Sequence, residues 1–296
     1  MTDFSPYLIV CDFDRTLTDR QSRIPAANLA AIEYFTAHGG LFTMGTGRSV
    51  PMFRPHYRKI PCNAPLILYN GAAVYDYGTG ILSDAIRIPA GKALLAWLLD
   101  RYPDLRFEVQ AVDAHLLIGE DPARIRFYED QGVVYRTVRP EEVSEPILKI
   151  AVFPTFRGTG VAQFFAGTAQ ELAAFDRAEA EIAAAWPELT VDRSAPRILD
   201  LQHKTANKGA AARRLADRLG RTLVCVGDAR NDAAMLREAD LAFAPADCDP
   251  AVKALGCCVL TRPCDDGAVA GVVEWLERAE ASGGGPARGT ERSQKV

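Results

Sequence analysis

The chain has 296 residues, of which 48% are hydrophobic and 24% charged, a composition typical of a globular protein with one large or two medium domains. Its formal net charge of -4 provides no basic surface for nucleic acid or an anionic membrane, so we expect neither partner. No apolar run is long enough to span a bilayer, and the 7 cysteines include no C-x-x-C pair. We therefore expect reduced thiols and a cytoplasmic location.

The first part of the chain alternates between strand and helix patterns. Residues 7–13 are apolar and β-branched, which predicts a buried strand. A helix should follow, opened by Pro25 and ended by Gly39–Gly40. Residues 41–44 and 66–69 predict two further strands. This order predicts an α/β fold with a Rossmann-like, doubly wound parallel sheet.

The pattern changes after Asn70–Gly71, which is a strong turn signal. Short strand-like and helical segments then follow without regular alternation, which indicates an α+β domain inserted into the sheet domain. The expected strands are 73–76, 106–111, 115–118 and 148–153, and the expected helices lie near 90–101 and 160–185.

The alternating pattern resumes near residue 198. We predict strands at 198–201, 222–226 and 240–243, and helices at 208–219, near 230–238 and at about 267–280. The prediction is a discontinuous core domain, residues 1–82 and 196–281, that encloses an inserted domain, residues 83–195. Hinges are expected near 80–86 and 192–197. Residues 282–296 are Gly-rich and polar, which predicts a disordered tail.

Two carboxylates, Asp12 and Asp14, stand at the end of the first predicted strand. The carboxyl ends of parallel strands are where α/β sheets place their sites. Because the two residues point to different sides, one can attack phosphorus while the other exchanges protons. Taken alone, such a pair is equally typical of a solvated turn.

A hydroxyl and two glycines follow the second predicted strand, in the segment from Gly45 to Arg48. Glycine lets the backbone approach an anion, and the hydroxyl of Thr46 with nearby N–H groups, including that of Gly47, can bind a phosphoryl oxygen. The segment has the spacing of neither a Walker loop nor a dinucleotide fingerprint, and a simple glycine turn remains the alternative.

A lysine and two carboxylates complete the candidate site. Lys208 opens a predicted helix, where its ammonium and the helix dipole favour an anion, although Lys204 competes for this role. Asp228 follows an apolar strand and is suited to a hard cation. Asp232 lies four residues later, where an ordinary helix N-cap is the alternative, and Asn231 precedes it.

Taken together, these segments resemble the haloacid dehalogenase superfamily of phosphohydrolases. The resemblance rests on residues 12–18, on Thr46, on Asn207-Lys208-Gly209 and on residues 227–232, and it extends to about residue 280. The large insertion between Thr46 and Lys208 resembles the Cof-like subgroup, in which an α/β cap of the C2B type is inserted there. One position departs from the pattern. A glycine often follows the second aspartate in this superfamily, whereas this chain has Arg15, which contacts the substrate or points to solvent.

The resemblance implies a role for each residue. Asp12 would be the nucleophile and Asp14 the general acid and base. Mg²⁺ would be held by Asp12, by the backbone carbonyl of Asp14 and by Asp228. Thr46 and Lys208 would hold the phosphoryl group, Asp232 would support the metal or orient Lys208, and Asn231 is a weaker candidate for a phosphate contact.

The expected function is therefore a Mg²⁺-dependent phosphatase that hydrolyses small phosphorylated metabolites, such as sugar phosphates, through an aspartyl-phosphate. Two alternatives remain open at this stage. One is a phosphomutase on the same scaffold, and the other is a phospho-accepting signalling protein without turnover. The size of the insertion argues against the signalling protein, because receiver domains are compact and carry no cap.

Overall fold

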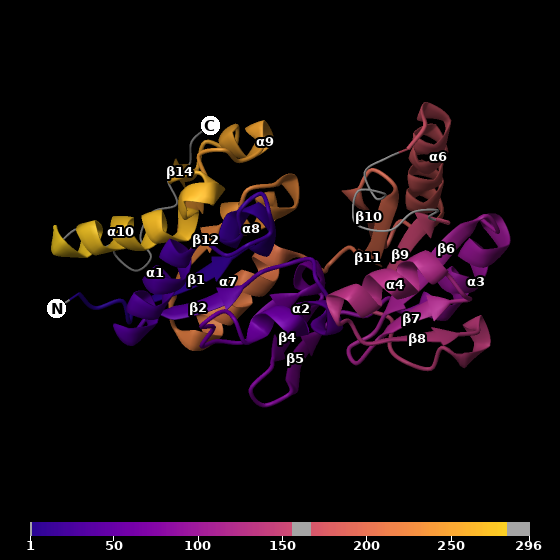
Figure 1. Ribbon diagram of the computed structural model, residues 1–296, viewed down its shortest axis with the longest axis horizontal. Coiled ribbons are helices and arrows are strands. Elements are labelled where there is room, and N and C mark those ends of the chain that lie inside the picture. Colours follow the sequence, from indigo (N-terminus) through magenta and orange to yellow (C-terminus); the bar gives the residue numbers. More distant parts are fainter. Residues whose placement is uncertain (1, 156–166, 283–296) are drawn as a thin grey trace. The chain divides into compact units, whose positions relative to one another are not determined.

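The computed structural model describes residues 2–155 and 167–282, and the chain forms two compact units (Figure 1). The first unit consists of Met1–Thr46, Ile60–Ile67 and Lys208–Val296, and the second of Gly47–Lys59 and Leu68–Asn207. Both ends of the inserted domain predicted from the sequence, residues 83 and 195, lie inside the second unit. The predicted tail, from residue 283 onward, lies outside the described residues.

The first unit is built on a parallel sheet of five strands in the order β14-β13-β12-β1-β2. Every residue of the central strand β1 is buried, as its apolar sequence predicts. The strands are β1 (Tyr7–Cys11), β2 (Leu41–Met44), β12 (Thr222–Val226), β13 (Leu241–Ala244) and β14 (Cys258–Leu260). Cys11 pairs with Val226 on one side and with Met44 on the other, so the carboxyl ends of three strands lie side by side.

Helices connect these strands and cover the sheet. They are α1 (Ala26–Ala37), α7 (Lys208–Leu219), α8 (Ala233–Glu238), α9 (Pro250–Lys253) and α10 (Ala268–Ala281). Helix α1 packs against α10, and α7 against α8 (Figure 1). Helix α1 begins directly after Pro25, whose fixed φ suits a helix start, and ends before Gly39, which has a φ of 91°. The parallel strands and connecting helices confirm the predicted α/β class.

The second unit contains a mixed sheet of six strands in the order β10-β11-β9-β6-β7-β8. All neighbours are antiparallel except β7 and β8. The strands are β6 (Leu105–Gln110), β7 (His115–Ile118), β8 (Tyr135–Val138), β9 (Lys149–Pro154), β10 (Leu189–Ala195) and β11 (Ile198–His203). Strands β3 (Leu66–Leu68), β4 (Ala73–Asp76) and β5 (Ile81–Ala85) form a separate sheet in the order β3-β4-β5, in which β4 and β5 are an antiparallel hairpin. Leu66 and Ile67 belong to the first unit, but the strand predicted at 66–69 is not one of the five strands of the parallel sheet.

One face of this sheet carries the hydrophobic core of the second unit. The helices of the unit are α2 (Val50–Tyr57), α3 (Gly91–Arg101), α4 (Pro122–Gln131) and α6 (Ala169–Ala185). Alternate sheet residues such as Val109, Ile150 and Leu201 pack with Leu94 of α3 and Ile182 of α6. The opposite face of the same strands carries the residues between them, and on β6, β9 and β11 several of these are polar.

Several predicted elements fall close to their expected places, but some expectations are wrong. The strand predicted at 198–201 forms, yet it pairs antiparallel with β9 and β10 in the second unit and is not part of the parallel sheet. The expected hinge segments, near 80–86 and 192–197, lie in paired β-hairpins, and their role as hinges stays a prediction. The helix expected at 160–185 is described only from Ala169, and residues 160–166 lie outside the described residues. None of the described helices has the length and apolarity needed to cross a membrane.

Candidate active site

Asp12 lies immediately beyond β1, at the carboxyl edge of the parallel sheet. Its backbone N–H donates to the carbonyl of Val226, and its own carbonyl accepts from the N–H of Leu17, which closes a helical turn over Phe13–Leu17. The residue is only 7% exposed. The strand and the turn therefore hold a carboxylate in a buried position at the edge where α/β sheets place their sites.

Lys208 is the first residue of α7 and is buried between two carboxylates. Its Nζ lies 2.7 Å from Oδ1 of Asp12 and 2.8 Å from Oδ1 of Asp232. Burial alone would lower the pKa of Lys208, but the two carboxylates outweigh it and raise the pKa above its ordinary value. Lys208 is therefore a fixed cation beside Asp12. The competing residue, Lys204, is exposed and donates to the carbonyl of Pro187.

Asp232 is fully buried and fixes the geometry around it. Its Oδ2 accepts hydrogen bonds from the backbone N–H groups of Asp228 (3.1 Å) and Ala229 (3.0 Å), while Oδ1 accepts from Lys208. A Cβ atom on Gly227 would lie 2.6 Å from the Cβ of Asp232, so only glycine fits this turn. Both oxygens of Asp232 are thus used to hold Lys208 and the turn in place.

Asp228 follows β12 and is 7% exposed. Its Oδ1 accepts from the hydroxyl of Thr16 at 3.0 Å, and its Oδ2 lies 4.0 Å from Nε of Arg15. Burial, with the Asp232 carboxylate as a second cause, raises the pKa of Asp228 to about 6. Burial and the same Asp232 charge also raise the pKa of Asp12, against the opposing effect of Lys208.

These carboxylates form a set that could hold a divalent cation. One oxygen from each of Asp12, Asp228 and Asp232 lies within 4.8 Å of the others, and all three residues are buried. Hard cations such as Mg²⁺ prefer oxygen ligands, so this donor set fits such an ion. Because both oxygens of Asp232 already accept hydrogen bonds, Asp12 and Asp228 are the better candidates for direct ligands.

The other predicted residues are placed differently. Thr46 is buried just after β2. Its neighbour Gly45 donates its N–H to the carbonyl of Cys11, which puts this segment beside the strand that carries Asp12. Asp14 and Asn231 are both exposed. Gly47 belongs to the second unit, where a Cβ atom would lie 2.7 Å from Oδ1 of Asn70.

The sequence analysis assigned no functional role to two further residues, Thr16 in the first unit and Asn70 in the second. Thr16 is fully buried and positions the Asp228 carboxylate, and its only sequence signal is its place in the segment that follows Asp12. Asn70 has a φ of 52° and follows Tyr69 with a φ of 50°, so two successive non-glycine residues adopt a left-handed conformation. The Asn-Gly turn signal was recognised, but its proximity to Gly47 could not be.

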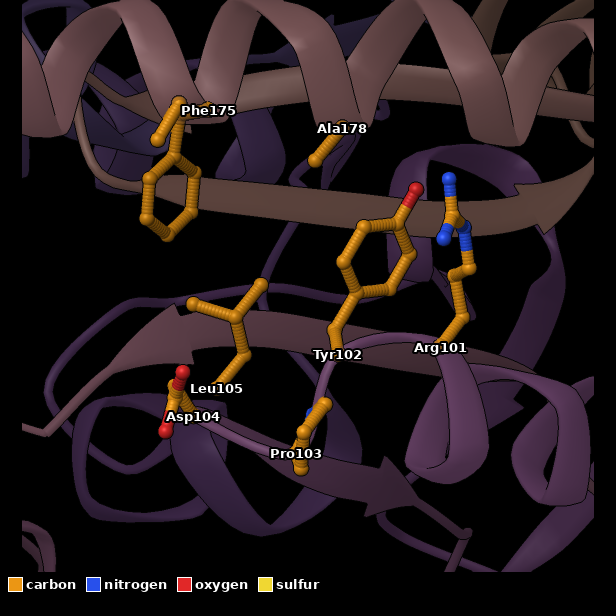
Figure 2. A pocket seen from close by; sticks show the side chains of 8 residues that line it. Arg101, Tyr102, Pro103, Asp104, Leu105, Phe175 and Ala178 are labelled. Carbon is orange, nitrogen blue, oxygen red and sulfur yellow. The ribbon is translucent and has the colours of Figure 1, made fainter.

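A cavity of about 180 Å³ lies in the second unit but carries none of these residues (Figure 2). It is bounded by residues 101–105 and by α6 residues that include Phe175. The guanidinium of Arg101 and the hydroxyl of Tyr102 donate to the carboxylate of Glu181. Two of the polar side chains at this cavity are thus already paired with Glu181, and the cavity contains none of the residues of the carboxylate cluster.

Comparison with known proteins identifies the family. The family model of the haloacid dehalogenase-like hydrolases matches residues 9–273, and the chain belongs to this family. A curated relative, the 5-amino-6-(5-phospho-D-ribitylamino)uracil phosphatase YwtE of Bacillus subtilis, is 26% identical over 249 residues, which cover 78% of this chain and 84% of the relative.

Solved structures share the fold. A haloacid dehalogenase-like hydrolase from Bacteroides thetaiotaomicron superposes with a TM-score of 0.77 at 18% identity, covering 91% of this chain and 99% of that one. The subclass IIB sugar phosphatase BT4131 gives a TM-score of 0.71 at 20% identity and covers 91% of this chain and 98% of its own. The resemblance recognised in the sequence is thereby confirmed.

Proposed function

We propose that the protein is a Mg²⁺-dependent phosphatase that hydrolyses small phosphate monoesters through an aspartyl-phosphate at Asp12. The observation that carries the proposal is the buried contact of Lys208 with both Asp12 and Asp232, beside Asp228. A phosphate monoester brings negative charge to a carboxylate nucleophile, and this arrangement supplies a fixed positive charge where the two meet. The phosphatase name of the curated relative supports the same activity.

The proposed reaction has two steps. In the first, a carboxylate oxygen of Asp12 forms a bond to phosphorus, the ester P–O bond breaks, and the leaving alcohol takes a proton from Asp14. In the second, water gives a proton to Asp14 and attacks phosphorus, which breaks the bond to Asp12 and releases inorganic phosphate. Lys208 and the hydroxyl of Thr46 would hold the phosphoryl oxygens throughout, and Gly47 and Asn231 are weaker candidates for this contact.

The residues fit a bound Mg²⁺, and Asp12, Asp228 and the backbone carbonyl of Asp14 would hold it. The ion would neutralise charge on the phosphoryl oxygens. Asp232 would act on Lys208 and on the turn that carries Asp228, since its oxygens are used there. Arg15, with a side chain 56% exposed, would lie beside the metal ligand Asp228 and reduce the excess of negative charge.

The substrate class we propose is a small phosphorylated metabolite. The curated relative is named for a phosphate ester of a ribityl group, which is a sugar-alcohol chain. This relationship and the sequence resemblance together favour sugar-like phosphates over nucleic acid, which a protein with a net charge of -4 does not attract through its overall charge.

The test is release of inorganic phosphate from a panel of phosphate esters, with Mg²⁺ or with EDTA. We expect Mg²⁺-dependent turnover that falls by a factor on the order of 10³ or more in Asp12→Asn, because the variant lacks the nucleophile. Asp217→Asn, on the exposed face of α7, serves as a matched control and should retain full activity. Equal activity of Asp12→Asn and wild type, or turnover unaffected by EDTA, would contradict the proposal.

A further inference from the structure

Asn28 is a polar residue in the core of the first unit and has no part in the chemistry proposed so far. It lies in the first turn of α1, and its side chain is fully buried. Burying an amide costs free energy unless its polar atoms are paired, and an apolar residue of similar size would avoid that cost. The contacts of Asn28 therefore indicate what its amide does.

Both ends of the Asn28 amide are paired. Its Nδ2 donates to the carbonyl of Leu17 at 2.8 Å, and its Oδ1 accepts from the N–H of Ala270 at 3.0 Å. Because a carbonyl can only accept and an N–H can only donate, these two bonds fix which end of the amide is oxygen. The side chain thus bridges two backbone groups that lie far apart in the sequence.

Each of these two backbone groups needs a partner from outside its own element. Ala270 lies in the first turn of α10, where N–H groups have no acceptor within the helix, and Asn28 supplies one. Leu17 is the last residue of the turn that follows Asp12, and carbonyls at the end of a helical turn are likewise left open. Asn28 therefore fastens the end of this turn to the start of α10.

The turn that Asn28 fastens carries groups on which the proposed chemistry depends. It begins directly after Asp12, and the N–H of Leu17 donates to the carbonyl of Asp12 at 3.2 Å. The backbone carbonyl of Asp14, a proposed metal ligand, belongs to the same turn. Leu17 thus receives a hydrogen bond from Asn28 at its carbonyl and gives one to the nucleophile's backbone at its N–H. The position of Asn28 therefore bears on the position of Asp12.

The turn needs support from outside because its backbone is irregular. Asp14 and Arg15 depart from helical φ and ψ angles, and Arg15 has a φ of 61°. Residues in such sparsely populated conformations keep them only where the surrounding structure holds them there. Thr16 provides one such contact through its bond to Asp228, and Asn28 provides another at the end of the turn.

We propose that Asn28 is a positioning residue, which holds the turn after Asp12 in the geometry that phosphoryl transfer requires. Because its side chain is fully buried, it acts through the carbonyl of Leu17 and not by contact with the substrate. A displacement of a reacting group by about 1 Å can lower a rate about 10²-fold, so one hydrogen bond at this place can govern the rate. This inference rests on the proposed phosphatase function and adds a residue that its reaction needs.

The first experiment removes only the bond to Leu17, with Asn28→Asp. Aspartate keeps the size and shape of asparagine and can still accept from the N–H of Ala270, but it has no N–H to donate to the carbonyl of Leu17. In steady-state kinetics with 4-nitrophenyl phosphate, we expect kcat to fall roughly tenfold or more while KM changes less than about twofold. A loss that appears in KM alone would contradict a positioning role.

Asn63 offers a matched control in the same unit. Its Nδ2 donates to the carbonyl of Gly40 at 3.0 Å, and its Oδ1 accepts from the N–H of Phe42 at 2.7 Å, so it also bridges two backbone groups. These groups lie at the beginning of β2, the end opposite to Thr46. Asn63→Asp therefore makes the same chemical change away from the carboxyl edge of the sheet, and kcat should stay unchanged. An equal fall in kcat in both variants would assign Asn28 a merely structural role.

A second variant, Asn28→Leu, removes both bonds without introducing a buried charge. We expect the same fall in kcat as for Asn28→Asp, since both variants lack the bond to Leu17. Full kcat in either variant, once circular dichroism shows that it is folded, would overturn the inference. Failure of both variants to fold would also count against it, because Asn28 would then serve the fold as a whole.

A binding measurement separates this inference from the proposed activity. Because the carbonyl of Asp14 is a proposed Mg²⁺ ligand in the same turn, Asn28→Leu should bind Mg²⁺ roughly tenfold more weakly than the wild type, as measured by the dependence of the melting temperature on Mg²⁺ concentration. Asn63→Leu should bind Mg²⁺ as the wild type does. Failure of the wild type to hydrolyse any phosphate ester would count against the phosphatase function, while the Mg²⁺ data would still judge Asn28. Equal Mg²⁺ affinity of Asn28→Leu and the wild type would refute its positioning role.

Discussion

Replacing Lys208 with methionine removes the cation that holds two buried carboxylates together. Lys208 is 2% exposed, and its Nζ contacts Asp12 and Asp232 at 2.7 Å and 2.8 Å. Methionine keeps much of the volume, so the effect on stability should come from the lost charge. The carboxylates would then face each other without compensation.

The size of the effect follows from the distance. Oxygens of Asp12 and Asp232 lie within 4.8 Å, and two unit charges at that distance repel by about 3.5 kcal/mol at an effective dielectric constant of about 20. Removing one partner of a buried ion pair ordinarily costs about 3–5 kcal/mol, which agrees with this figure. We therefore expect Lys208→Met to lower the free energy of unfolding of the first unit by about 3–5 kcal/mol. Mg²⁺ should restore part of the loss, because it supplies another cation to the same carboxylates.

The assay is urea unfolding followed by the fluorescence of Trp275, which packs against Phe243 in the first unit with ring centroids 5.2 Å apart. The other two tryptophans, Trp97 and Trp186, belong to the second unit, and for this experiment both are replaced by phenylalanine in the Lys208→Met protein, in its control and in the reference protein. Lys204→Met is the matched control, and its effect should stay below about 0.5 kcal/mol. A loss below about 1 kcal/mol for Lys208→Met, or one no larger than that of the control, would refute the reasoning.

Two further predictions concern protons and the second unit. Burial raises the pKa of Asp12 and raises that of Asp228 to about 6, so protons compete with Mg²⁺ for these carboxylates. The rise in melting temperature produced by Mg²⁺ should therefore be larger at about pH 8 than at about pH 5.5. Equal rises at the two pH values would contradict this prediction. The pKa of Glu108 is shifted in the opposite direction, downward. Burial would raise its pKa, but Arg124 and His115 hold that pKa well below its ordinary value of 4.5, so its contribution to stability is present above that pH and is lost on acidification. Glu108→Gln should destabilise the second unit by about 3–5 kcal/mol at neutral pH, measured by the fluorescence of Trp97 and Trp186. The variant should also lose less stability than the wild type when the pH is lowered. An equal loss of stability at low pH would show that Glu108 is not the responsible group.

The sequence predicted strands β1, β2, β12 and β13 of the parallel sheet because they are short apolar runs between helix signals, but it also assigned residues 66–69 and 198–201 to this sheet, and both lie in other sheets. The predicted bounds of residues 41–44, 208–219 and 222–226 coincide with β2, α7 and β12. The structure brings Asp12, Lys208 and Asp232 together as expected, since all three lie at strand ends or helix starts of one sheet. Their catalytic roles, and those of Asp14 and Asn231, stay predictions.

The second unit was harder to predict because its structure depends on pairings between distant segments. Helix α2 was not predicted because it contains two prolines, Pro51 and Pro55, which ordinarily argue against a helix. The helix forms nevertheless, because Pro51 lies in its first turn and Ser49 caps it by accepting from the N–H of Met52. Strand β11 was assigned to the wrong sheet, since its alternation of apolar and polar residues does not specify which strand it joins. The contact between Lys149 and Asp200 depends on that register and has no local signal.

The backbone conformation at Arg15 limits which residues can stand at this position and explains why glycine suits it. With a φ of 61°, the residue sits in the left-handed region, and its N–H donates to the hydroxyl of Thr18, which fixes the turn after Asp12. Glycine adopts this conformation at no steric cost, asparagine and aspartate at a small one, and β-branched residues at a large one. Proline is excluded, since its ring fixes a negative φ. Variation at this position among related proteins is therefore limited first by the shape of the main chain, and an arginine there does not by itself indicate a different substrate.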